Sequence, residues 1–226
     1  MGDPAAELRE LHELTSRVHG WLTPGEGELL YGLARNCTGR GVIVEIGSWK
    51  GKSTIWLGRG SQAGRQVPVY SIDPHTGAPE QQQAYGTVWT FHEFEANVRQ
   101  AGIEPLVRPI VKTSADAASD FKEPIELLFV DGAHEYEAVR LDFELWFPKL
   151  IEGGTIAFHD TKKPGPKQLI RERVLGSRQI GEVGFADTIL YARKVAVSTL
   201  SQRFKSRTAF ARRRLVKRLQ RLSGLR

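Results

Sequence analysis

The stretch that decides the fold is residues 41–54, Gly-Val-Ile-Val-Glu-Ile-Gly-Ser-Trp-Lys-Gly-Lys-Ser-Thr. Its apolar run is typical of a strand that is buried on both faces of a parallel sheet. Gly47 and Gly51 then fit the outer positions of a five-residue turn, with Trp49 in the middle, which lets the backbone approach a ligand. Residues 53–57 are predicted to start the following helix. The stretch therefore predicts a strand, a glycine turn and a helix in direct succession.

The same alternation of strand and helix recurs along the chain. Four more strands are predicted at residues 67–73, 106–111, 125–130 and 155–158, with helices at 87–101, 115–121 and 136–147. Residues 179–183 and 188–192 would add a closing antiparallel pair. This order predicts a doubly wound α/β fold with a mostly parallel, seven-stranded sheet.

Two amphipathic helices are predicted before the first strand. The first carries apolar side chains at helical spacing, namely Leu8, Leu11, Leu14 and Val18. The second starts after Thr23-Pro24, where Thr23 is the N-cap and Glu26 completes a capping box. We predict three segments: an N-terminal helix at 1–22, the main domain at 23–194 and a basic tail at 195–226.

Length and composition exclude several classes of protein. The chain has 226 residues, 40% of them hydrophobic, which is enough for one domain with a core. Cys37 is the single cysteine, so an internal disulfide is excluded and a reducing compartment is expected. No apolar stretch approaches the roughly 20 residues of a membrane-spanning helix, and the start of the chain has no signal-peptide pattern. We therefore predict a cytoplasmic protein.

The positive charge is concentrated in the tail. Residues 203–226 hold ten Arg and Lys and no acid, so residues 1–202 carry a net charge of −4 although the whole chain is at +6. On a helix, the tail would present one mostly apolar stripe, formed by Phe204, Thr208, Ala211, Leu215, Leu219 and Leu222. A basic amphipathic helix is typical of segments that bind anionic membranes, and we predict this role for 203–226. A solvated tail and a nucleic-acid contact are the open alternatives.

The end of the glycine turn, Gly51-Lys52-Ser53, also resembles part of a phosphate-binding loop. Such a loop has four residues between its first glycine and the Gly-Lys-Ser. Counted from Gly47, three residues stand there, so the loop is one residue short. A kinase or other nucleotide-binding protein is therefore the disfavoured interpretation, and a tight turn without any ligand is another alternative.

Polar residues stand where the predicted strands end. These are Glu45, Gly47, Asp73, Ser114, Asp131, His159 and Asp160. Because ligands of doubly wound sheets bind beyond the carboxyl ends of the strands, these positions predict one common site. An acid at the end of the second strand, Asp73, can accept the hydroxyls of a ribose. A plain turn acid is the alternative for that position.

Two Asp and two His residues form a second cluster. They are Asp131, His134, His159 and Asp160, at adjacent strand ends. Such a set can surround a divalent cation or serve as acid and base. An isolated histidine is more often structural, but the shared location of these four favours a functional site.

The ordered motifs resemble those of class I S-adenosylmethionine-dependent methyltransferases. The motifs are 44–54, Tyr70-Ser-Ile-Asp73-Pro74, Phe129-Val-Asp131-Gly-Ala-His134, Gly153-Gly154 and His159-Asp160. The sequence is most similar to the methyltransferase 24 family, related to macrocin-type sugar O-methyltransferases and more distantly to catechol O-methyltransferases. The resemblance covers roughly residues 20–194.

The resemblance implies a role for each matching residue. The methionine end of the cofactor would be surrounded by Glu45, Gly47, Ser48, Trp49, Gly51 and Ser53. Asp73 would hold the ribose, and Ser114 would lie near the adenine. Asp131 would lie at the cofactor as well and, with His159 and Asp160, matches the place where metal-dependent relatives bind magnesium. His134 matches the position of a lysine base in the catechol-type enzymes.

These expectations define an O-methyltransferase. His134 would take a proton from the acceptor hydroxyl, and a divalent cation such as Mg²⁺ on Asp131 and Asp160 would orient that hydroxyl. The acceptor is expected to be a small molecule or saccharide, bound between two long loops at residues 74–89 and 161–178. A homo-oligomer that pairs through the N-terminal helix is a further expectation. A non-catalytic nucleotide- or S-adenosylmethionine-binding protein and an RNA methyltransferase are the alternatives.

Overall fold

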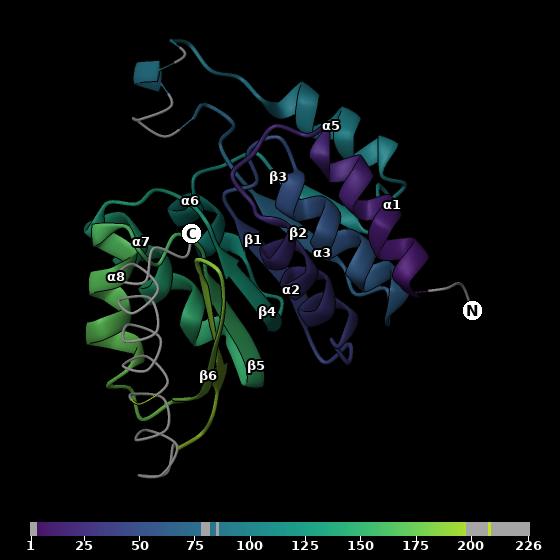
Figure 1. Ribbon diagram of the computed structural model, residues 1–226. Helices are drawn as coiled ribbons and strands as arrows, with labels where there is room; N and C mark the ends of the chain where they lie inside the picture. Colours follow the sequence, from purple (N-terminus) through teal and green to yellow (C-terminus); the bar gives the residue numbers. More distant parts are fainter. Residues whose placement is uncertain (1–3, 78–81, 85, 198–207, 209–226) are drawn as a thin grey trace, which may run out of the picture.

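A seven-stranded sheet with the order β3-β2-β1-β4-β5-β7-β6 runs through the molecule (Figure 1). The computed structural model describes residues 4–77, 82–84, 86–197 and 208. The strands are β1 (Val42–Ile46), β2 (Val69–Ile72), β3 (Val107–Ile110), β4 (Ile125–Val130), β5 (Leu150–Phe158), β6 (Ile180–Ala186) and β7 (Ile189–Lys194). β1 to β5 pair in parallel, whereas β7 pairs antiparallel with both β5 and β6. The predicted fold and its closing antiparallel pair are confirmed.

Helices cover both faces of this sheet (Figure 1). They are α1 (Pro4–Ser16), α2 (Pro24–Arg35), α3 (Lys52–Ala63), α5 (Phe91–Gln100), α6 (Ser114–Asp120), α7 (Tyr136–Trp146) and α8 (Pro164–Leu169). α1, α2, α3 and α5 share one hydrophobic core with the sheet, and α6, α7 and α8 share the other. A 3-10 turn (Phe147–Lys149) precedes β5, and a π-helical turn (Ile170–Val174) continues α8.

The central strand β4 shows why the apolar runs form a parallel sheet. All six of its residues are buried. Leu127 and Phe129 point into the core under α3, while Leu128 and Val130 point into the core under α7. Successive side chains of a strand face opposite sides, so a strand covered on both faces needs apolar residues at nearly every position.

The stretch 161–178 differs from the expected loop. It contains α8 and the π-helical turn, although Pro164-Gly165-Pro166 is a sequence more usual in loops. Pro164 stands in the first turn of the helix, where the missing N–H costs no hydrogen bond. A Cβ at Gly165 would lie 2.1 Å from the carbonyl oxygen of His134. The glycine therefore lets α8 pack closely against the loop that carries His134.

The N-terminal helices pack on the sheet-covering helix α3. Leu11 of α1 and Leu30 of α2 are fully buried in the same core as Trp56. The predicted capping box of α2 is confirmed, because Thr23 and Glu26 exchange backbone-to-side-chain hydrogen bonds. Residues 1–22 and 23–194 were predicted as separate segments, and their boundary falls in the connection between α1 and α2.

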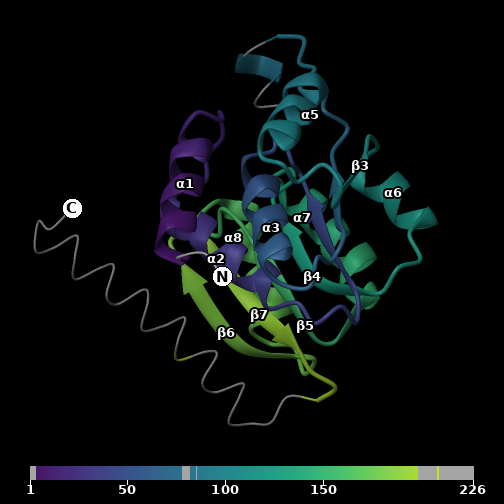
Figure 2. The same cartoon turned by 90° about the vertical axis from the view of Figure 1, so that its right-hand side faces the viewer.

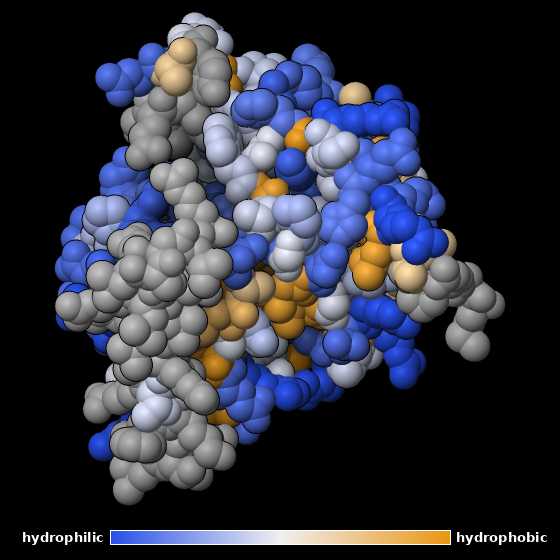
Figure 3. Space-filling model, viewed as in Figure 1, coloured by the Kyte–Doolittle hydropathy of each residue, from blue (hydrophilic) through white to orange (hydrophobic). Residues whose placement is uncertain are grey.

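The strand β6 forms one edge of the sheet, with β7 between it and β5 (Figure 2). The face seen in Figure 3 is largely hydrophilic, with hydrophobic side chains gathered near its centre. Within the described ranges, no helix is both long and apolar enough to cross a membrane. The predicted amphipathic tail at 203–226 lies outside the described residues, apart from Thr208.

Candidate active site

A cavity of about 760 Å³ opens at the carboxyl ends of β1, β2, β4 and β5. Its volume lies in the upper part of the range of pockets that bury a small organic ligand. Ten of the twelve predicted site residues line it, namely Gly47, Ser48, Trp49, Ser53, Asp73, Ser114, Asp131, His134, His159 and Asp160. The other two, Glu45 and Gly51, do not. Most of the residues predicted from their position at the carboxyl ends of strands therefore line one pocket.

The loop from Gly47 to Gly51 is held by close packing and by left-handed backbone. Gly47 has a φ of 85°, and a Cβ there would lie 2.3 Å from the carbonyl oxygen of Asp131. Gly51 has a φ of 87° and is the N-cap of α3, which places it behind the pocket wall. Both glycines are needed because L-residues with a Cβ rarely adopt this conformation.

The carboxylate of Asp73 fastens this loop to the end of β2. Its Oδ2 accepts hydrogen bonds from the backbone N–H groups of Ser48 and Trp49, both at 2.8 Å. Its Oδ1 accepts one from the N–H of His75 at 2.6 Å. A carboxylate has about four lone-pair positions, so these three bonds leave room for one further donor. Asp73 can therefore accept one ribose hydroxyl rather than both without changing this arrangement.

Glu45 lies under the loop and anchors α3 to the sheet. It is fully buried, and its Oε2 accepts hydrogen bonds from Thr54 at 2.5 Å and Ser71 at 2.9 Å. Burial raises the pKa of this carboxyl to about 7. Glu45 therefore supports the wall of the pocket from behind instead of lining it.

The first turn of α3 forms one end of the pocket. No side chain caps this helix, so its first N–H groups have no side-chain acceptor. Lys52 and Ser53 line the pocket here, and burial lowers the pKa of Lys52. Lys52 donates to the carbonyl of Gly20 at 3.4 Å and has no carboxylate partner among the described residues. The nearby hydroxyl of Ser48 is buried and has no hydrogen-bond partner within the described part of the chain. This end therefore suits an anionic group.

Ser114 marks the opposite side of the pocket, at the start of α6. Its hydroxyl accepts a hydrogen bond from the indole N–H of Trp146 at 2.8 Å. Asp142 of α7 also lines the pocket, and burial raises its pKa to about 6. These groups offer hydrogen-bonding atoms in a mostly apolar wall, as a nucleobase site requires.

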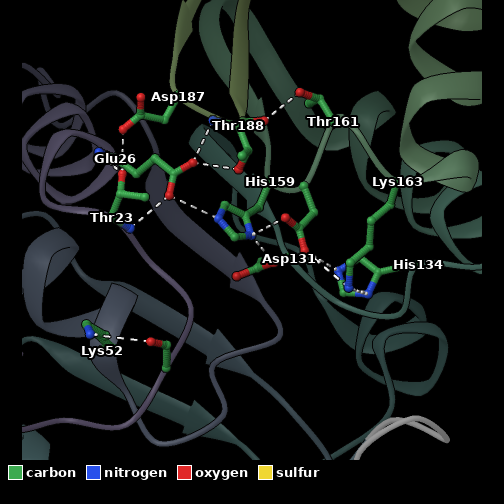
Figure 4. A network of polar contacts seen from close by, with 12 residues as sticks. Thr23, Glu26, Lys52, Asp131, His134, His159, Thr161, Lys163, Asp187 and Thr188 are labelled. Carbon is green, nitrogen blue, oxygen red and sulfur yellow. Dashed lines mark hydrogen bonds and ion pairs between the residues drawn. The ribbon is translucent and has the colours of Figure 1, made fainter. Parts of the chain in front are cut away.

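A buried charged bridge joins three distant parts of the chain beneath the pocket (Figure 4). Nδ1 of His159 lies 2.9 Å from Oδ1 of Asp131, and its Nε2 lies 3.3 Å from Oε2 of Glu26. Burial disfavours a charged imidazole, but the two carboxylates outweigh burial and raise the pKa of His159 to about 10. His159 is therefore an imidazolium at neutral pH, with both ring N–H groups donating.

Glu26 is one of the residues at this site that the sequence did not predict. It is fully buried, and its Oε1 accepts from the backbone N–H and the hydroxyl of Thr188, at 2.7 and 2.5 Å. Its Oε2 accepts from the N–H of Thr23 at 2.9 Å as well as from His159. Burial acts to raise its pKa, but hydrogen bonds from His159, Thr188 and Thr23 lower it to about 2. The capping box identified Glu26, but no sequence signal pointed to its partner His159, directly after β5.

His134 and Lys163 lie side by side on the right of Figure 4, and Asp160 completes this second polar group. Nζ of Lys163 lies 2.9 Å from Nδ1 of His134, and Nε2 of His134 lies 3.3 Å from Oδ2 of Asp160. An ammonium group has only donors, so Nδ1 is the accepting nitrogen and Nε2 carries the ring proton. Lys163 was not among the predicted site residues, because the segment that carries it was expected to be a loop.

The predicted metal set at Asp131, His159 and Asp160 does not fit a divalent cation. Both ring nitrogens of His159 donate to carboxylates, which leaves no lone pair for a metal. Asp160 has a φ of 50° and lies 3.3 Å from both His134 and Lys163. Among the described residues, no three His, Cys, Asp or Glu side chains are grouped to hold a metal ion. The three side chains expected to hold magnesium thus contact one another or other charged groups of the chain.

Only some residues of the two segments expected to bind the acceptor line the pocket. From residues 74–89, Pro74, Gly77 and Ala84 line the pocket, and from 161–178 Lys163 does. His75 does not, because it is fully buried and bonded to Thr90 at 2.9 Å. The segment 19–22 was missed as a wall, and its Trp21 ring lies 5.9 Å from that of Trp49.

Comparisons with known proteins agree with this geometry. The uncharacterized protein y4gI of Sinorhizobium fredii is 32% identical over 122 residues, which are 53% of this chain and 13% of that protein. The chain spans half or less of the length of the curated relatives it matches. The O-methyltransferase NovP superposes with a TM-score of 0.72 at 17% identity, over 85% of this chain and 100% of that one. An O-methyltransferase from Bacillus cereus gives 0.58 at 17% identity, over 86% and 92%. At these identities, the two structures show the same fold.

The match that decides the family covers residues 44–161, from the first strand to the end of the fifth. It spans the glycine loop, Asp73, Ser114, Asp131 and His134. It ends before Lys163 and Thr188 and begins after Glu26, so these three contributions to the site lie outside the shared region. The chain belongs to the methyltransferase 24 family, whose matching region is described as a methyltransferase domain.

Proposed function

We propose that the chain transfers a methyl group from S-adenosylmethionine to a hydroxyl of a small molecule or saccharide. The observation that carries the proposal is the single pocket in which the glycine loop, Asp73 and Ser114 face His134 and Asp131. Two structures of the same fold support it, because NovP is an O-methyltransferase and the Bacillus cereus enzyme was solved with S-adenosylhomocysteine.

The pocket residues fit this cofactor from end to end. Lys52, Ser53 and the uncapped first turn of α3 would hold the methionine carboxylate. Asp73 would accept one ribose hydroxyl, and Ser114 with Asp142 would flank the adenine. When bound, S-adenosylmethionine supplies a methyl group activated by its positive sulfur.

The chain itself must orient the acceptor hydroxyl and take its proton. Methyl transfer converts O–H to O–CH₃, so one proton must leave the acceptor. We propose that Nδ1 of His134 takes it after the hydroxyl has displaced Lys163 from this nitrogen. The imidazolium that forms would be stabilised by Asp160, 3.3 Å from Nε2. Asp131, which lines the same pocket, would accept a hydrogen bond from a second hydroxyl of the acceptor and so align the reacting hydroxyl, whose own proton goes to His134.

The side chains at the rim of the pocket favour an acceptor with a flat apolar face. The rings of Trp21 and Trp49 lie beside the cavity, and Trp21 is 57% exposed. Sugar rings and aromatic rings both pack against indole faces. A saccharide or an aromatic hydroxyl compound therefore fits this rim.

The test of the proposal is the pair of variants His134→Ala and Lys163→Met. We expect His134→Ala to lower turnover roughly 100-fold or more while S-adenosylhomocysteine binding changes by only a few-fold. Lys163→Met is the comparison, because it leaves Nδ1 of His134 open and should keep far more activity. Wild-type turnover in His134→Ala would remove the base assignment.

The acceptor class can be found with a labelled methyl group. Purified protein and labelled S-adenosylmethionine are incubated with cell extract, which is then divided into lipid, glycan, RNA and protein fractions. We expect the label in the lipid or glycan fraction. Label confined to RNA would favour the alternative of an RNA methyltransferase that uses its basic tail, and binding without any transfer would favour a non-catalytic module.

A further inference from the structure

Asp131, at the end of β4, is held by two charged hydrogen bonds in series that begin at Glu26 in the N-terminal part of the protein. Asp131 is bonded to His159, and His159 is bonded to Glu26 of α2 (Figure 4). The side chains of His159 and Glu26 are 4% and 0% exposed, whereas that of Asp131 is 24% exposed. The bridge thus runs from the interior to the pocket surface.

We propose that the Glu26–His159–Asp131 bridge takes the place of a divalent cation, so that this enzyme orients its acceptor without a metal. The proposal rests on the function proposed above. His159 acts as a positioning residue, because neither of its ring nitrogens is free to contact the acceptor. Asp131 is the residue that contacts the acceptor, through a second hydroxyl beside the one that reacts.

The contacts of Glu26 show that several hydrogen bonds hold the bridge in place. Four donors converge on its two oxygens: the backbone N–H of Thr23, the N–H and hydroxyl of Thr188, and Nε2 of His159. Thr23 is itself bonded through its hydroxyl to Asp187 at 2.6 Å. Because each donor fixes one lone pair, Glu26 cannot turn away from His159 without leaving buried groups unpaired.

The bridge also defines which oxygen of Asp131 serves the acceptor. Oδ1 accepts from His159 at 2.9 Å, while Oδ2 accepts no hydrogen bond from the described residues. Asp131 lines the pocket beside His134. A second hydroxyl of the acceptor that donates to Oδ2 would therefore hold the reacting hydroxyl near His134, the group proposed to take its proton.

A cation at this place would have to break the bridge. It would compete with His159 for Asp131, and the positive charge that the two carboxylates require is already supplied by the ring between them. Asp160, the remaining acid, lies 3.3 Å from the ammonium of Lys163. Each carboxylate that a metal would need thus has a positively charged partner within the chain.

The test is direct titration of the full chain with Mn²⁺, read by electron paramagnetic resonance in the presence of S-adenosylhomocysteine. We expect no binding to the wild type and no loss of methyl transfer in EDTA. The variant His159→Asp removes the bridging donor and adds a carboxylate, so it should gain Mn²⁺ binding. His159→Asn is the matched control, which loses the bridge without adding a charge and should bind no Mn²⁺.

Saturable Mn²⁺ binding to the wild type, with methyl transfer lost in EDTA and restored by the metal, would overturn the proposal. The wild-type titration decides the question even if the variants do not fold. Binding of S-adenosylhomocysteine, measured separately, reports on the proposed function. A chain that binds it and also needs Mn²⁺ would refute the bridge alone.

Discussion

Oε2 of Glu26 lies 3.3 Å from Nε2 of His159, although 133 positions separate the two residues in the sequence. The contact joins the first turn of α2 to the end of β5, and both side chains are buried. It holds the positively charged ring of His159 in place at the pocket, between Glu26 and Asp131. The N-terminal helices are thus part of the site as well as part of the fold.

Replacing Glu26 by Gln should destabilise the protein by about 3 kcal/mol, because the change leaves a buried imidazolium with one carboxylate instead of two. The free energy of unfolding is measured in urea. The control is Glu28→Gln on the same helix, whose side chain is 50% exposed and contacts His12. That change should stay within about 0.5 kcal/mol of the wild type. Equal effects of the two substitutions would show that the buried bridge adds nothing to stability.

Stability should depend on pH on both sides of a mildly acidic maximum. The pKa of Glu26 is lowered from 4.5 to about 2, so its contribution is complete above pH 4.5 and is lost as the pH falls toward 2. The pKa of His159 is raised from 6.5 to about 10, so its contribution is complete below pH 6.5 and is lost as the pH rises toward 10. Burial raises the pKa of Glu45 from 4.5 to about 7, which lowers stability as the pH rises across that interval.

These shifts together place the highest free energy of unfolding at about pH 4.5, because Glu26 loses its contribution below that pH and Glu45 lowers stability above it. Urea unfolding at a series of pH values measures it. A free energy that keeps rising from pH 6.5 to 10 would contradict the charge state assigned to His159.

Gly47→Ala should abolish cofactor binding through steric conflict. The new Cβ would lie 2.3 Å from the carbonyl oxygen of Asp131, at a φ of 85°. Gly39→Ala is the matched control, because Gly39 has the same φ and a Cβ added there would meet no atom within 4 Å. We expect Gly47→Ala to cost about 2 kcal/mol more than the control and to remove S-adenosylhomocysteine binding. If both variants bind it equally, the loop does not need this close approach.

The basic tail should bind anionic membranes. Residues 203–226 carry ten positive charges and no acid, and each basic residue near such a surface contributes about 1 kcal/mol. Co-sedimentation with vesicles that contain phosphatidylserine should show salt-sensitive binding for the full chain and none for a chain that ends at Gln202. Equal sedimentation of the two proteins, or none of either, would exclude this role.

The fold could be predicted from the sequence because its main signals lie within short stretches of the chain. Apolar runs such as Ile125–Val130 predict buried parallel strands, and their bounds agree with β4. Thr23 and Glu26 likewise indicate the start of α2 through a capping box. The helix α8 was missed, because proline and glycine in its first turn resemble a loop.

The site was predictable to the extent that it lies at strand ends. Gly47, Asp73 and Asp131 share one sheet edge by topology alone. The bridge behind Asp131 could not be predicted, because Glu26 meets His159 and Thr188 meets Glu26 only through the packing of α2 and the β6–β7 turn. A histidine beside two acids suggested a metal site, whereas the structure shows a charged hydrogen bond on each ring nitrogen.

The central claim, that this pocket serves S-adenosylmethionine, is tested most directly by calorimetry with S-adenosylhomocysteine and, in parallel, with ATP and Mg²⁺. The account predicts saturable binding of S-adenosylhomocysteine at one site per chain, which weakens in Lys52→Met, and no binding of ATP. Binding of ATP through Lys52 with no binding of S-adenosylhomocysteine would contradict it.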